Sequence, residues 1–234
     1  MVLELADRAD SNSAVRKDVW VQVPPAAPDE ADRGPNCRAS PPEPVRCVDD
    51  RGLGRSYPYL LGLYLGDGML SMARRNVWRL RISMDMKYPV IIARAKAAIS
   101  EVADRSAGEI ARQGCVEIYS NWKHWGCLFP QHGPGPKHRR RIRLEGWQTR
   151  LVSRYPDEFL AGLIHSDGCR CLNQVKGKVY PRYFFSNSSV DIRSLFAATC
   201  IQVGIECRLA GPRNLSIAKR ASVEVLDRLV GPKR

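Results

Sequence analysis

Two aspartates close matched ten-residue stretches of this chain. FLAGLIHSDG (residues 159–168) ends in Asp167 and Gly168, and YLLGLYLGDG (residues 59–68) ends in Asp67 and Gly68. Each stretch reads as a short apolar helix with a carboxylate at its C-terminal end, where the helix dipole is negative and disfavours further negative charge. If the two helices pack together, the carboxylates repel one another unless a cation intervenes. Carboxylate oxygens favour Mg²⁺ or a similar hard ion as that cation.

A glycine stands in the middle of each apolar stretch. Gly62 and Gly162 each cost a helix about 1 kcal/mol relative to alanine. This cost makes sense where two helix backbones approach closely. We therefore predict that the two helices pack side by side and join two half-domains. The alternative is a core helix with a surface aspartate, and the second matched copy argues against it. Gly68 and Gly168 are expected to end the helices in the left-handed conformation.

The elements around these stretches recur in the same order. Asp67 and Asp167 are 100 residues apart and Ser83 and Ser186 are 103 apart, the difference being absorbed by a QVKGK hairpin at 174–178. Hydrophobic periodicity predicts, in the first half, a helix at 59–66, strands at 69–73 and 77–85, a helix at 88–102, a strand at 115–120 and a short helix from about 122. In the second half it predicts a helix at 159–166, strands at 169–175 and 179–187, a helix at 189–204, strands at 206–210 and 214–218, and a helix at 219–229. An internal duplication of an αββαββα unit is the simplest account, so the fold class is α+β with two pseudo-symmetric half-domains.

The chain divides by composition into four parts. Residues 1–56 hold 7 of the 16 prolines and are expected to form a disordered leader. The half-domains span 57–130 and 157–234, with a basic connector at 131–156. The formal charge is +13, and because the leader carries −2, residues 57–234 carry +15. Such a positive field suits a polyanionic partner, most commonly nucleic acid, although a basic surface that only confers solubility is the alternative.

Cysteines and hydropathy limit the other classes of function. The eight cysteines form no CxxC pair and no apolar signal peptide is visible, so we expect a reduced, cytoplasmic protein. Cys37 and Cys47 could be half of a zinc knuckle, but two further ligands are missing nearby. The spacing of Cys127, His132 and His138 matches no zinc finger. No apolar stretch approaches the roughly 20 residues that cross a bilayer, so no membrane partner is expected.

The second stretch resembles the LAGLIDADG motif of homing endonucleases. The two agree at Leu160, Ala161, Gly162, Leu163, Ile164, Asp167 and Gly168 and differ at His165 and Ser166. The first stretch is a looser match that keeps Gly62, Leu63, Asp67 and Gly68. The resemblance covers about residues 57–230. It implies a single-chain, two-motif member, a monomer with an internal pseudo-twofold axis, which straddles double-stranded DNA with two saddle-shaped antiparallel sheets.

The resemblance also implies a reaction. The terminal acid of each motif, Asp67 and Asp167, would bind Mg²⁺ (or Mn²⁺) at the scissile phosphates, one per strand, and we include the preceding Gly66 and Ser166 in the metal site. A basic side chain would assist, and Lys87 is the residue we suggest. His165 replaces an acid of the family pattern that does not bind metal, and we expect it to be a partly buried helix residue. Two alternatives share this scaffold: a DNA-binding regulator that no longer cuts, and an RNA-splicing maturase. Since such regulators typically lack the acids, their presence favours the enzyme.

Residues for contact with DNA follow from the strand alternation. In 78–84, Leu80, Ile82 and Met84 form the apolar set and leave Arg79, Arg81 and Ser83 on the other face. In the second half, Tyr183 and Phe185 fall on the core side, and Tyr180, Arg182, Phe184 and Ser186 on the outer face. Outward arginines at such positions read guanine in the major groove, or else contact phosphate or solvent.

A run of basic residues lies between the half-domains. PGPKHRRRIR (134–143) contains Lys137, Arg139, Arg140, Arg141 and Arg143, and the second hairpin adds Lys176 and Lys178. Such runs suit contacts with phosphate, which give affinity without sequence information. A solvated linker is the competing interpretation.

Overall fold

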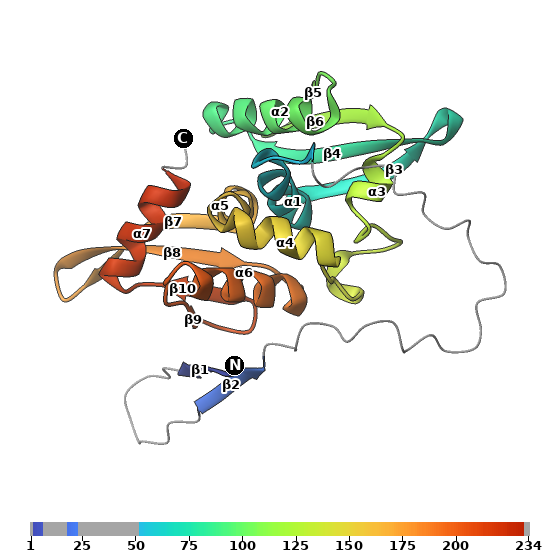
Figure 1. Cartoon of the computed structure of the whole chain (residues 1–234). Coiled ribbons are helices and arrows are strands. Elements are labelled where there is room, and N and C mark those ends of the chain that lie inside the picture. Colours follow the sequence, from blue (N-terminus) through green and yellow to red (C-terminus); the bar gives the residue numbers. More distant parts are fainter. Residues whose placement is uncertain (1, 7–17, 23–51, 232–234) are drawn as a thin grey trace, which may run out of the picture.

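The computed structural model describes residues 2–6, 18–22 and 52–231 and has an α+β architecture (Figure 1). Within these residues the two main sheets are each four-stranded and antiparallel. In the segment predicted as a disordered leader, β1 (Val2–Ala6) and β2 (Asp18–Gln22) pair as antiparallel strands. Cys37 and Cys47, considered above as zinc ligands, lie outside the described residues.

The first half-domain follows the predicted order with one added strand. Its elements are α1 (Ser56–Asp67), β3 (Gly68–Ala73), β4 (Val77–Asp85), α2 (Pro89–Ala103), β5 (Gly108–Arg112), β6 (Cys115–Trp122) and α3 (Trp125–Leu128). A 3₁₀ turn, η2 (Arg74–Asn76), joins β3 to β4. The sheet order is β3-β4-β6-β5. Pro89 occupies the first turn of α2, where its missing N–H breaks no helical hydrogen bond.

The second half-domain repeats this arrangement. Its elements are α5 (Pro156–Asp167), β7 (Gly168–Val175), β8 (Lys178–Ser186), α6 (Val190–Gln202), β9 (Arg208–Leu209), β10 (Asn214–Ile217) and α7 (Arg220–Val230). The sheet order is β7-β8-β10-β9, the same as in the first half. The predicted αββαββα repeat is therefore confirmed.

The connector carries structure that the sequence did not predict. A 3₁₀ turn, η3 (Lys137–Arg139), is followed by the helix α4 (Gly146–Arg154). A capping box begins α4: the Glu145 side chain accepts from the helix backbone, and the backbone N–H of Glu145 donates to Gln148 Oε1 at 2.9 Å. Leu151 and Val152 are buried, so α4 is packed against the body of the protein and is no solvated linker.

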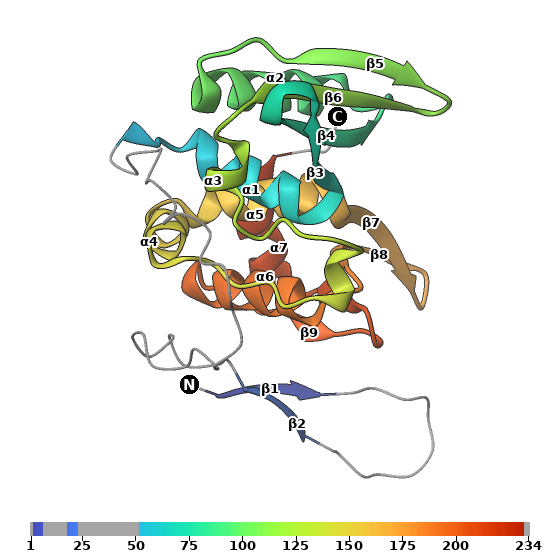
Figure 2. The same cartoon turned by 90° about the vertical axis from the view of Figure 1, so that its right-hand side faces the viewer.

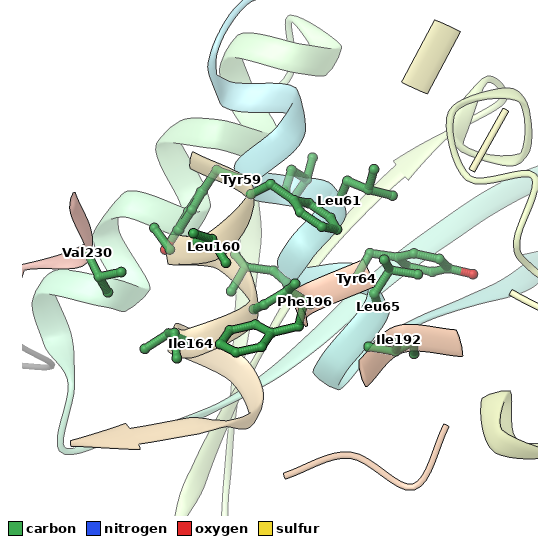
Figure 3. Packing of buried hydrophobic residues seen from close by; sticks show 14 of the residues in the cluster. Tyr59, Leu61, Tyr64, Leu65, Leu160, Ile164, Ile192, Phe196 and Val230 are labelled. Atoms are coloured by element: carbon green, nitrogen blue, oxygen red, sulfur yellow. The ribbon is translucent and has the colours of Figure 1, made fainter. Parts of the chain in front are cut away.

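The helices α1 and α5 form the centre of the core. Figures 1 and 2 show them side by side, with one half-domain on each side of the pair. Both helices are buried on nearly every face, as their apolar sequences require, and the hydrophobic residues from Tyr59 to Leu65 and from Phe159 to Ile164 are at most 1% exposed. Figure 3 shows the side chains of this cluster, in which Phe196 of α6 also packs. Among the described helices, none is long and apolar enough to cross a membrane.

Candidate metal and nucleic-acid site

The backbones of α1 and α5 touch at their central glycines. A Cβ atom on Gly62 would lie 2.7 Å from the carbonyl oxygen of Phe159 and 2.8 Å from the amide nitrogen of Leu163. A Cβ atom on Gly162 would lie 2.2 Å from the carbonyl oxygen of Tyr59. These neighbours are backbone atoms, so no side chain can move aside. Only glycine fits at either position, and this fixes the crossing point of the two helices.

The glycines that follow the two aspartates have a different role from the one predicted. Gly68 (φ −86°, ψ 153°) and Gly168 (φ −99°, ψ 159°) are extended, so the expected left-handed conformation is wrong. Each helix instead passes directly into a strand. A Cβ atom on Gly68 would lie 2.5 Å from Tyr64 Cα, and one on Gly168 would lie 2.7 Å from Ile164 Cα. Close approach of the strand to the last helical turn therefore requires glycine.

The two aspartates are the last residues of their helices. Asp67 is exposed and Asp167 is half-buried. A Cβ atom on Gly66 would lie 3.0 Å from Asp167 Oδ2, which places that carboxylate beside the last turn of α1. The amide of Asn187 donates to the same oxygen at 2.6 Å. Nothing in the sequence pattern identified Asn187, because its relation to Asp167 depends on how β8 ends.

Lys137 of the connector lies at the same place. Its Nζ atom donates to the carbonyl oxygens of Tyr64, Leu65 (3.1 Å) and Gly66 (2.9 Å), all in the last turn of α1. It also lies 5.0 Å from the ring centroid of Tyr64. Burial lowers the pKa of Lys137 to about 8, and the carboxylates of Asp167 and Asp67 act in the opposite direction. The ammonium is thus within electrostatic range of both acids.

Arg140 also turns back onto the protein. One of its terminal nitrogens donates to the carbonyl oxygens of Gly133 (2.8 Å), Pro134 (3.3 Å) and Gly135 (2.5 Å). Burial raises the pKa of Tyr64 to about 12, and the guanidinium of Arg140 opposes this rise. Arg140 and Lys137 therefore have partners within the chain, although the sequence suggested phosphate contacts for both.

Arginines from both sheets lie on the faces away from the core. Arg79 and Arg81 of β4 alternate with the buried Leu80 and Ile82, and Ser83 follows on the outer face. The Nε atom of Arg79 donates to Asn121 Oδ1 at 2.8 Å, and its guanidinium lies 5.1 Å from the ring centroid of Tyr119. Arg81 donates to Ser71 Oγ at 3.2 Å. Neighbouring strands thus hold both arginines in place.

The second sheet presents a corresponding face. Tyr183 and Phe185 are buried, as predicted, and leave Arg182 and the exposed Ser186 on the other side of β8. The guanidinium of Arg182 lies 5.1 Å from the ring centroid of Phe184. Lys176 and the exposed Lys178 are at the hairpin between β7 and β8, where Lys176 has a positive φ of 50°.

The other basic residues predicted for the site fall into two groups. Arg139, Arg141 and the exposed Arg143 belong to the connector, and the first two line an open pocket of about 280 Å³ beside the N-terminal end of α6. Lys87 is exposed, its Nζ atom 2.6 Å from Asp85 Oδ2 and 5.0 Å from the ring centroid of Tyr88. These contacts are with its sequence neighbours.

Two further residues considered in the sequence can be placed. His165 is buried, and its Nδ1 atom lies 3.0 Å from the Tyr59 hydroxyl across the helix pair. His132 packs edge-on against Trp78, with ring centroids 4.7 Å apart. In the described part of the chain, no three His, Cys, Asp or Glu residues gather as in a zinc site. Any ion at Asp67 and Asp167 would therefore complete its coordination with backbone, water or phosphate oxygens.

Comparison with known proteins identifies the fold. No family model matches the sequence. No curated protein matches it either. Among solved structures, I-DmoI in complex with DNA and Ca superposes with a TM-score of 0.52 at 17% identity, over 76% of this chain and 90% of that one. A variant of I-DmoI with its target DNA and Mn gives a TM-score of 0.50 at 16% identity, over 79% and 97% of the two chains.

The matched structures share their fold with this chain. I-DmoI is a homing endonuclease. Another match, the N-terminal LAGLIDADG domain of DUF199/WhiA, has 13% identity and a TM-score of 0.49 over 81% of this chain and 89% of that one. The chain therefore has the LAGLIDADG homing endonuclease fold, with both motifs in one polypeptide.

Proposed function

We propose that this chain is a metal-dependent, sequence-specific endonuclease that cleaves double-stranded DNA. The observation that carries the proposal is the joint placement of Asp67 and Asp167 at the touching ends of α1 and α5. Both acids come from one chain, so a monomer would supply one carboxylate to each DNA strand. The complexes of I-DmoI with DNA and with Ca or Mn support this proposal by analogy of fold.

The donor set fits Mg²⁺ or Mn²⁺. Mg²⁺ is usually held by one or two carboxylates together with water and substrate phosphates, and Asp67 and Asp167 supply two carboxylates. A bound ion would lower the pKa of water and stabilise charge on the phosphate. Asn187 would orient the Asp167 carboxylate through its 2.6 Å hydrogen bond. Gly66 and Ser166 would contribute through their backbone carbonyl oxygens, and that of Gly66 accepts from Lys137 in the metal-free protein.

The outer faces of the sheets would bind the duplex. Arg79 and Arg182 occupy equivalent positions of the two repeats, and each lies against an aromatic ring. This contact orients the planar guanidinium, which suits bidentate contact with guanine. Arg81, Ser83, Lys178 and Ser186 would contribute from the same faces, and Lys176, Arg139, Arg141 and Arg143 would contact phosphates.

Supercoiled plasmids with a randomised insert test the activity. Incubation with Mg²⁺ should linearise the plasmids that carry a target, and incubation with EDTA should leave the pool supercoiled. Sequencing of the linear ends gives the target. If no linear DNA forms at any Mg²⁺ or Mn²⁺ concentration, the endonuclease proposal is wrong.

A second candidate is a DNA-binding regulator that does not cut. Lys137 favours it, because its ammonium supplies positive charge near both acids without a metal ion. For this candidate, a randomised duplex pool should yield a specific gel shift in EDTA while the plasmids stay intact in Mg²⁺. The same outcome would leave no catalytic role for metal at Asp67 and Asp167. A splicing maturase would instead select RNA from a mixed pool.

A further inference from the structure

Positive and negative groups meet at the end of α1. Its last carbonyls and its dipole make this end negative, and Asp67 and Asp167 add two carboxylates close by. Without a cation these negative groups repel one another, and the cost is greatest at the half-buried Asp167. Lys137 is the residue of the described chain whose ammonium is bonded there.

The hydrogen bonding of Lys137 is complete. A lysine ammonium has three donors and no acceptor, and its three contacts are with the carbonyl oxygens of Tyr64, Leu65 and Gly66. These carbonyls belong to the group that an α-helix leaves without helical partners at its C-terminal end. The contact with the Tyr64 ring adds cation–π attraction. The ammonium is therefore held in one place, as a bound metal ion would be.

The end of α5 is stabilised differently. The Ser166 hydroxyl donates to the carbonyl oxygens of Gly162 (3.1 Å) and Leu163 (3.0 Å), and Asn187 donates to Asp167. These are neutral donors. A positive charge is therefore bonded at the end of α1, whereas neutral donors are bonded at the end of α5. The two repeats differ in how the surroundings of their aspartates are stabilised.

We propose that Lys137 is the resident cation of the acid pair, which neutralises Asp67, Asp167 and the end of α1 until a divalent ion binds. This rests on the proposed metal site, because a divalent ion that uses the Gly66 carbonyl competes with the ammonium for that oxygen. In the metal-free protein Lys137 supplies the positive charge, so the fold does not require a divalent ion. Metal binding at the α1 side costs the displacement of Lys137.

Mn²⁺ titration without DNA, followed by electron paramagnetic resonance, measures this competition. Lys137→Met removes the charge and should raise the affinity of the protein for Mn²⁺ by about tenfold or more, as expected for loss of a close like charge. In EDTA its unfolding temperature should fall below that of the unaltered protein, and Mg²⁺ should restore most of the loss. The unaltered protein should gain less in unfolding temperature from Mg²⁺ than Lys137→Met does, because displacement of Lys137 offsets part of the binding.

Arg154→Met is the matched control. It removes a cation from the same connector, but Arg154 is exposed beside the N-terminal end of α5, the opposite end of that helix from Asp167, and lies against the ring of Tyr155. Its affinity for Mn²⁺ should stay within about twofold of the unaltered protein, since a distant exposed charge acts weakly through solvent. Lys137→Gln retains a donor without charge, and it serves if Lys137→Met does not fold.

Equal Mn²⁺ affinity in the unaltered protein, Lys137→Met and Lys137→Gln would overturn the proposal, as would equal gains in Lys137→Met and Arg154→Met. The readout involves neither DNA nor cleavage. A protein that cuts no plasmid can therefore still support the role of Lys137, and a protein that cuts can still refute it.

Discussion

At the residue scale, the site depends on four glycines, which have no side chain. Gly62 and Gly162 allow two backbones to touch, and Gly68 and Gly168 allow each helix to turn straight into a strand. The crossing was predictable, because a matched pair of glycines inside apolar helices is costly unless the two backbones touch there. The conformation of Gly68 and Gly168 was not, since a glycine after a helix is compatible with both a left-handed cap and a close strand. Their φ angles depend on the tertiary approach.

Alanine at the crossing should destabilise the protein. Gly62→Ala and Gly162→Ala each place a methyl group against backbone atoms, and we expect losses of about 3 kcal/mol in the free energy of unfolding, at the upper end for overpacking. Urea denaturation measures them. Gly146→Ala is the control, because its Cβ would lie 3.9 Å from the Arg150 side chain, in ordinary contact. Losses for Gly62→Ala and Gly162→Ala as small as that of Gly146→Ala would contradict the close crossing.

At the scale of elements, the long periodic segments were predictable and the short or polar ones were not. The helix at 88–102 and the strand at 77–85 lie within two residues of α2 and β4, because each shows a single clear period. β5 was missed because GEIAR is short and mostly exposed. α4 was missed because its sequence, GWQTRLVSR, is dominated by polar residues and its burial depends on Gln148.

Gln148 should be essential for the position of α4. It is fully buried, and its amide donates to the Tyr57 hydroxyl at 2.6 Å and accepts from Gln131 at 2.5 Å. Gln148→Ala removes these buried hydrogen bonds and leaves a cavity, while Tyr57 still donates to Leu128 and Gln131 to Arg143. We expect a loss of about 2 to 3 kcal/mol in unfolding free energy. Denaturation in urea again gives the value. Ser153→Ala, on the exposed side of the same helix, should change stability by less than about 0.5 kcal/mol.

At the scale of the whole molecule, the positions of the basic residues decide which of them are available to bind a polyanion. The sequence predicts a positive surface for polyanions, and the structure divides its cations into two kinds. Lys137 and Arg140 are bonded to backbone carbonyls of the chain, whereas Arg79 and Arg182 lie on the outer faces of the sheets against aromatic rings. Composition could not separate these groups, since it counts all four only as basic residues. Their roles depend on how the connector folds back onto α1.

Binding of DNA should follow this division. Arg79→Ala and Arg182→Ala should each weaken binding of the selected duplex by about 1 to 3 kcal/mol, and if the arginine contacts phosphate, the slope of affinity against salt should fall by about one. Fluorescence anisotropy at several salt concentrations measures both quantities. Arg220→Ala is the control, since Arg220 lies on α7 with its side chain 90% exposed and paired with Glu224. If all three variants weaken binding equally, the outer faces of the sheets are not the binding surface.

The pair of aspartates is the centre of this account, and cleavage by aspartate variants tests it most directly. The unaltered protein, Asp67→Asn, Asp167→Asn and the double variant are compared on one supercoiled plasmid that carries the selected target, with gel shifts in Ca²⁺ as a measure of binding. We predict that the unaltered protein yields linear DNA in Mg²⁺ and that the double variant yields none while it still binds. Linear DNA from the double variant at an undiminished rate would show that neither carboxylate takes part in cleavage.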